Sequence, residues 1–96
     1  MALTSPEKRL QTATAPRTVT VLGATGSIGR NTVDLLARNP QRFQAVALTA
    51  RSNVELLAEQ ARLLEPQMAV IGDPDRRGDL QDALQGTAVE VMAGEA

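Results

Sequence analysis

Residues 23–29 read GATGSIG, from Gly23 to Gly29, and place three glycines at intervals of three residues. This glycine-rich segment follows a short β-branched and apolar run, residues 18–22 (TVTVL), and precedes residues with helical periodicity. A strand, a glycine-rich turn and a helix in direct succession form a phosphate-binding unit, because the free amides and dipole at the start of a helix attract an anion. The segment therefore predicts a nucleotide-binding α/β domain.

Each position of this turn has an expected role in binding a dinucleotide. Gly23 permits a tight turn out of the strand, and Gly26 leaves room for a pyrophosphate against the backbone. Gly29 allows the helix to pack close to the sheet, while Thr25 and Ser27 add hydroxyl donors. The spacing is not the commoner G-x-G-x-x-G, so a turn that serves the fold alone stays open as an alternative.

A second group of candidate residues lies where the next strand is predicted to end. An acidic residue there would accept a hydrogen bond from the ribose 2′-hydroxyl of NADH, but no acid occurs before Glu55. A guanidinium can instead pair with the 2′-phosphate of NADPH. We therefore predict NADPH rather than NADH, with Arg51, Ser52 and Asn53 as the candidate residues for its 2′-phosphate.

Plainer explanations exist for the same residues. Ser52 resembles the start of a capping box that is completed by Glu55, and Asn53 also suits a helix start. Arg51 fits a solvated position equally well. Asp73 and Asp75 flank Pro74 and are better explained by a turn than by a cation site.

Strand and helix patterns alternate along the whole chain. A repeated strand–helix alternation predicts right-handed crossovers and a parallel sheet. We expect the fold class α/β, a Rossmann-like doubly wound parallel sheet of which only the N-terminal part is present, with strand order 3-2-1-4. In the first helix, Ile28, Val33, Leu36 and Ala37 recur at helical spacing and should face the core. The predicted strands span residues 18–22, 43–49, 68–71 and 88–92, and the predicted helices span 27–38, 53–64 and 79–85.

Length and composition limit what this chain can be. Its 96 residues suffice for one small domain, which we place at 18–96. We expect it to be incomplete at its C-terminal end, because the fourth strand would leave an open sheet edge. Residues 1–17 are polar and predicted to be a disordered extension. A transit peptide is less favoured because of Glu7 and few arginines, so we expect a cytoplasmic protein.

Charge and residue types exclude several classes of function. The net charge is −1, with neither cysteine nor histidine, which disfavours nucleic-acid binding and removes the commonest zinc ligands and general base. No apolar run approaches the length of a membrane span. We therefore predict no nucleic-acid or membrane partner.

A longer succession of residues is more specific than the glycine-rich turn alone. After the glycine-rich turn come Asn31-Thr32-Val33-Asp34-Leu35, then an Asn-Pro-x-x-Phe turn at residues 39–43, and then residues 47–54 (ALTARSNV). This succession resembles the 1-deoxy-D-xylulose 5-phosphate reductoisomerase family, from about Arg17 to the end of the chain. Some members carry Gly-Lys-Asn where this chain has Arg51-Ser52-Asn53.

The resemblance implies an enzyme that reduces and rearranges a sugar phosphate in the non-mevalonate route to isoprenoids. It implies NADPH, a divalent cation (Mg²⁺ or Mn²⁺) and a homodimer. It places Thr25, Gly26, Ser27 and Ile28 at the pyrophosphate, and Ala50 to Asn53 at the adenosine ribose. The family's metal ligands, substrate-phosphate residues and catalytic loop have no counterpart here, so we expect this piece not to catalyse alone. Another GATG reductase, of the semialdehyde dehydrogenase type, and a stand-alone nucleotide-binding module stay open as alternatives.

Overall fold

A computed structural model of the chain describes residues 16–94. The extension predicted for residues 1–17 lies outside this range except for Pro16 and Arg17, and Arg17 is the first residue of a strand. The alternation of strands and helices is confirmed. The observed elements are β2 (Arg17–Val21), α1 (Ser27–Arg38), β3 (Phe43–Ala50), α2 (Val54–Leu64), β4 (Met68–Ile71), the 3₁₀ helix η1 (Pro74–Arg76), α3 (Arg77–Ala83) and β5 (Glu90–Ala93).

The four described strands form one parallel sheet, which confirms the predicted α/β class. Their order is β2-β3-β4-β5, so the predicted order 3-2-1-4 is wrong for the fourth strand. The prediction assumed that the chain turns back past the first strand after β4. Instead α3 packs beside α2, and β5, the strand that follows α3, pairs with β4. Met68 pairs with Glu90 and Ile71 with Ala93.

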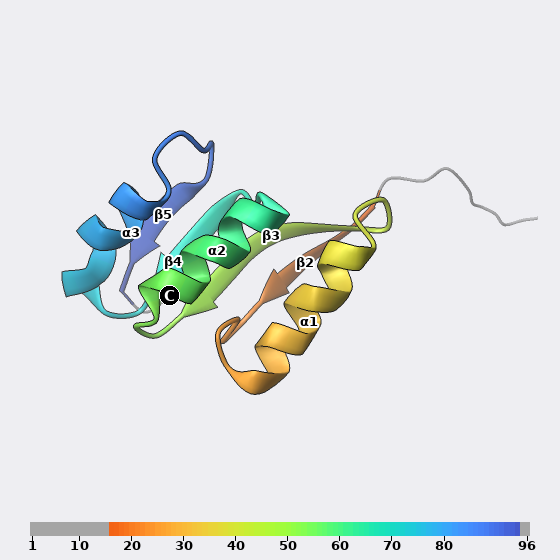
Figure 1. Ribbon diagram of the computed structural model, residues 1–96, viewed down its shortest axis with the longest axis horizontal. Helices are drawn as coiled ribbons and strands as arrows, with labels where there is room; N and C mark the ends of the chain where they lie inside the picture. Colours follow the sequence, from red (N-terminus) through yellow and green to blue (C-terminus); the bar gives the residue numbers. More distant parts are fainter. Residues whose placement is uncertain (1–15, 95–96) are drawn as a thin grey trace, which may run out of the picture.

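All three α-helices cover the same face of this sheet (Figure 1). This follows from the strand order, because right-handed crossovers that always step in one direction place their helices on one side. The turns that follow β2, β3 and β4 consequently meet at one edge of the sheet, the edge formed by the carboxyl ends of the strands (Figure 1).

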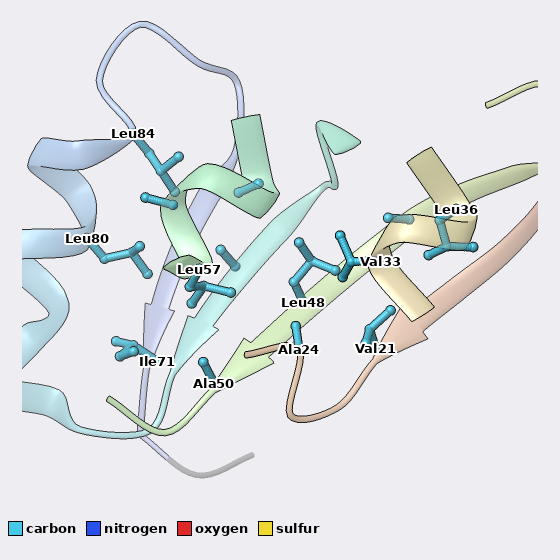
Figure 2. Close-up of a cluster of buried hydrophobic side chains, with 14 residues drawn as sticks. Val21, Ala24, Val33, Leu36, Leu48, Ala50, Leu57, Ile71, Leu80 and Leu84 are labelled. Atoms are coloured by element: carbon cyan, nitrogen blue, oxygen red, sulfur yellow. The ribbon is translucent and has the colours of Figure 1, made fainter. Parts of the chain in front are cut away.

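The core fills the layer between the helices and the sheet (Figure 2). Its largest fully buried side chains are aliphatic, as expected for a chain with one aromatic residue. They come from β3, α2, β4 and α3, and are Leu48, Leu57, Ile71 and Leu80. Burial of such side chains is worth about 1.5–3 kcal/mol each, so this layer fixes the strand ends that carry the candidate site.

One irregularity adjusts the pairing of the first two strands. Val19 pairs with Ala45, but its neighbour Thr20 pairs with Ala47, so Val46 is an extra residue on β3. Such a bulge changes which face the following residues occupy. Ala45 and Leu48, three positions apart, can therefore both be buried in the core.

Candidate functional site

The three glycines of the turn after β2 are required for different reasons. Gly23 has a φ of +65°, a left-handed conformation that favours glycine. At Gly29 a Cβ atom would lie 2.7 Å from the Cα of Ala24, so the fold itself excludes a side chain there. At Gly26 a Cβ atom would meet only the carbonyl oxygen of Gly23, at the ordinary contact distance of 3.5 Å. The fold therefore requires the first and third glycines but not the second.

The start of α1 carries no side chain that would compete with an anion for its free N–H groups. Its N-cap is Gly26, no side chain caps its first amides, and no acidic residue lies in its first turn. By contrast, α2 is capped by Asn53 and carries Glu55 in its first turn. The exposed N–H groups and the positive end of the helix dipole at α1 are therefore available to an anion.

Contacts from two other elements hold the glycine-rich turn in place. The Gly23 N–H donates to the Oγ1 of Thr49 at 3.0 Å, and the Ala24 N–H donates to the Thr49 carbonyl oxygen at 2.7 Å. From α2, the Gln60 Nε2 donates to the Ala24 carbonyl oxygen at 2.8 Å. The turn is thus bound to β3 and α2 and presents its remaining amides outward.

A cleft of about 660 Å³ lies on one side of this turn, across the ends of β3 and β4. Ala50 lines it, although this residue is only 6% exposed and belongs to the core cluster. Arg51 also lines the cleft and is exposed. The full lining is Leu22, Gly23, Thr49, Ala50, Arg51, Val70, Gly72, Asp73 and Gly94.

A second hollow of about 540 Å³ lies on the other side of the turn and shares Leu22 and Gly23 with the first. It is lined by Gly26, Ser27, Ile28 and Gly29 together with residues of β2 and α1. Ile28 is 81% exposed, so its predicted place on the buried face of α1 is wrong. The buried residues of α1 are Gly29, Val33 and Leu36, and with 3.6 residues per turn Ile28 lies about 100° away from the face that they share.

The residues that begin α2 are exposed beside the first cleft. The predicted capping role of Ser52 is wrong, because the cap is one residue later: Asn53 Oδ1 accepts from the Leu56 N–H at 3.1 Å. Asn53 keeps its Nδ2 as a donor. Ser52 and Asn53 do not line the cleft themselves, whereas Arg51, directly before them, does.

Sequence reasoning missed three residues of this site. The sequence places Thr49 at the end of a strand and predicts no binding role for it, although its hydroxyl holds Gly23. Gly72 and Asp73 directly follow the third predicted strand without a predicted role in binding, yet their N–H groups donate to the carbonyl oxygens of Ala50 and Arg51 at 2.8 and 2.9 Å. Their position directly after the third strand was the available signal, because the ends of parallel strands share one edge.

Asp73 also serves the local fold. Its Oδ1 accepts from the Asp75 N–H at 3.0 Å at the start of η1, as the predicted turn requires. Among residues 16–94 no group of three or more acidic, histidine or cysteine side chains is arranged to hold a metal ion. Within the same range no helix is both long and apolar enough to cross a membrane.

A parallel α/β domain with an uncapped helix start beside two clefts at its strand ends defines the class of dinucleotide-binding domains. Residues 19–96 match the family model for 1-deoxy-D-xylulose 5-phosphate reductoisomerase, and the chain belongs to that family. Among curated relatives, the reductoisomerase of Zymomonas mobilis is 56% identical over 79 residues, covering 82% of this chain and 20% of the relative. That of Rhodospirillum centenum is 54% identical over 80 residues, covering 83% and 20%.

Solved structures agree with this assignment. The Zymomonas mobilis reductoisomerase in complex with NADPH matches with a TM-score of 0.81 and 56% identity, over 82% of this chain and 21% of that structure. A reductoisomerase in complex with NADPH, fosmidomycin and magnesium matches with a TM-score of 0.76 and 30% identity, over 82% and 20%. The chain therefore spans about one fifth of the length of the relatives it matches.

Proposed function

We propose that this chain binds NADPH across the carboxyl ends of β2, β3 and β4. The adenosine half occupies the cleft between Arg51 and Asp73, and the pyrophosphate lies on the amides at the start of α1. The nicotinamide half extends toward the hollow lined by Leu22 and Ile28. The two hollows share Leu22 and Gly23, so one extended ligand can cross the glycine-rich turn and contact both.

The geometry at Gly26 is the single observation that carries this proposal. A side chain at this position would meet no clash within the protein, and its φ of −76° and ψ of 172° suit any residue. Glycine is accepted at an N-cap, but Ser, Asp or Asn would cap the helix better, and we take the absence of any side chain to leave room for a ligand that approaches the backbone there. The uncapped, acid-free start of α1 identifies that ligand group as an anion.

Charge around the first cleft supports NADPH over NADH. Arg51 lines the cleft and is exposed, and no acidic residue follows β3 until Glu55, within α2. Asp73 is the one acid in the lining, but it follows the next strand, and one of its oxygens is engaged by the Asp75 N–H. The Arg51 guanidinium can pair with the 2′-phosphate, and Ser52 and Asn53 Nδ2 can add donors at the helix start.

The reaction proposed for the whole protein is the conversion of 1-deoxy-D-xylulose 5-phosphate to 2-C-methyl-D-erythritol 4-phosphate. Bound NADPH supplies the hydride, and the described residues bind and orient the cofactor. The described residues do not fit a divalent cation, because they form no acidic cluster, so no step is assigned to a metal here. A homodimer and a cytoplasmic location remain predictions.

Fluorescence titration with NADPH and NADH tests the binding proposal. We expect saturable binding of NADPH and at least tenfold weaker binding of NADH, which corresponds to about 1.4 kcal/mol. Equal affinity for the two cofactors would contradict the assignment of Arg51, Ser52 and Asn53.

A chimera tests the proposed reaction. Residues 19–96 of this chain replace the matching fifth of the Zymomonas mobilis reductoisomerase, whose sequence is 56% identical there. We expect NADPH oxidation that requires both deoxyxylulose phosphate and a divalent cation. A folded chimera that instead turns over only a semialdehyde substrate would place this chain in another class of reductase.

A further inference from the structure

Gln60 is the one buried polar side chain among residues 16–94, at 5% exposure. It lies on α2 within the aliphatic layer, between Ala58 and Ala61, which are also buried. Its Nε2 donates to the carbonyl oxygen of Ala24, which is 36 positions earlier in the chain and 2.8 Å away. Burying an amide among apolar groups is unfavourable unless its hydrogen bonds are satisfied, so this contact needs an explanation.

Stability alone does not explain the choice of glutamine. The Oε1 of Gln60 is buried and has no hydrogen-bond partner among the residues that the structure describes. A methionine has nearly the same length and would fill this space without a buried unpaired acceptor on the side chain. What glutamine adds over methionine is the bond to Ala24.

The hydrogen bond from Gln60 to the Ala24 carbonyl also orients the next N–H group, that of Thr25, because the peptide unit is planar. The carbonyl of Ala24 and the N–H of Thr25 belong to one trans peptide unit, so they point in opposite directions. Thr49 accepts from the N–H of Ala24 at 2.7 Å, while Gln60 holds its carbonyl. The Thr25 N–H is thereby directed away from α2, and none of the described residues provides a backbone acceptor for it.

We propose that Gln60 is a positioning residue that holds the Thr25 N–H toward the pyrophosphate of the cofactor. This rests on the proposed binding of NADPH. The side chain of Gln60 acts only through the peptide unit between Ala24 and Thr25. It couples α2, whose first residues lie beside the adenosine cleft, to the turn that binds the phosphates.

The test compares Gln60→Met with the wild-type chain and with Gln81→Met, the same change at an exposed helical position. Two ligands are titrated: NADPH, and adenosine 2′-monophosphate, which lacks the pyrophosphate. We expect Gln60→Met to weaken NADPH about tenfold or more, as loss of a hydrogen bond to a charged group does. Affinity for adenosine 2′-monophosphate should stay within about twofold, and Gln81→Met should bind both ligands as the wild type does.

The thermal midpoint distinguishes positioning from a merely structural role. In Gln60→Met the unpaired Oε1 of Gln60 is removed, but the carbonyl oxygen of Ala24 loses its donor. One unpaired acceptor therefore replaces another, and the thermal midpoint should shift by less than about 5 °C. Equal weakening of both ligands would overturn the positioning role. A wild-type chain that binds neither ligand would refute the proposed function, and the role of Gln60 with it.

A second measurement in the wild-type chain does not depend on the variant folding. The backbone amide resonance of Thr25 should move on addition of NADPH, and it should stay in place with adenosine 2′-monophosphate. The Ala24 amide, bonded to Thr49, should be protected from hydrogen exchange without ligand. A Thr25 resonance that ignores NADPH while other residues of the site respond would overturn the proposal.

Discussion

Gly29 and Gly23 lie so close that a Cβ atom at residue 29 would overlap the carbonyl oxygen of Gly23. The overlapping atom belongs to the backbone and cannot rotate away, since the Ala24 backbone also approaches within 2.7 Å. The close approach of α1 to the turn after β2 is therefore possible only because residue 29 has no side chain.

We predict that Gly29→Ala strongly destabilises the fold. The added methyl forces α1 away from the turn, and overpacking of this kind costs about 1–3 kcal/mol or more. Thermal unfolding measures the effect. Gly78→Ala is the matched control, because this helical glycine has open space at its Cβ and alanine there should stabilise by up to about 1 kcal/mol.

Gly26→Val should separate binding from folding. The backbone of Gly26 is extended and its Cβ position is nearly open, so the loss of stability should stay within about 2 kcal/mol, the effect of an unfavourable N-cap residue. The branched side chain would occupy the place proposed for the pyrophosphate, so NADPH binding should be abolished. Unchanged NADPH affinity in a fluorescence titration would remove this turn from the cofactor site.

Arg51→Glu should shift the cofactor preference toward NADH. The change replaces a cation by an anion in the lining of the first cleft, which repels a 2′-phosphate and offers an acceptor to a 2′-hydroxyl. The ratio of the two dissociation constants measures it. Arg42→Glu makes the same charge change just before β3, at the opposite end of that strand, and should leave the ratio unaltered.

Asn53→Asp tests whether Asn53 serves more than helix capping. Aspartate caps a helix as well as asparagine does, so the bond to the Leu56 N–H and the stability should persist. The new charge and the loss of the Nδ2 donor should weaken NADPH binding, by about tenfold, while NADH is weakened less. If NADPH affinity stays the same, Asn53 is a cap alone.

Arg62→Met should destabilise the packing of α2 against α3. The guanidinium donates to the Ala83 carbonyl oxygen through Nε and Nη2, at 3.1 and 2.8 Å, and to the Gln85 carbonyl oxygen at 3.1 Å. Losing these charged donors should cost about 1.5–3 kcal/mol. Arg38→Met, which breaks an exposed ion pair with Asp34, should cost less than about 1 kcal/mol.

Local sequence patterns predicted most of the elements because neighbouring residues determine them. The helix from Ser27 to Arg38 and the strand from Met68 to Ile71 were predicted with their observed bounds. The position of β5 was not, because periodicity does not say on which side of the sheet the chain continues. That choice depends on how α3 packs beside α2.

The candidate site was predictable where one turn contains it. Gly23 to Gly29 and Ala50 to Asn53 are continuous segments, each at the step from a predicted strand to a predicted helix, which is the context of a nucleotide-binding turn. Thr49 and Gln60 were not predicted, because their contacts to Gly23 and Ala24 join residues 26 and 36 positions apart. A threonine in a strand and a glutamine in a helix carry no local signal of such contacts.

The sequential order of the strands also has a consequence for folding. Each described strand after the first pairs with the one before it in the chain, so each pairing closes a shorter loop than a crossover past another strand would, and the entropic cost of closing a loop rises with its length. During synthesis the sheet can grow in the direction in which the chain emerges from the ribosome. The glycine-rich turn and the two residues that hold it, Thr49 and Gln60, are translated before β4, so this turn can be fixed in place before the rest of the sheet forms.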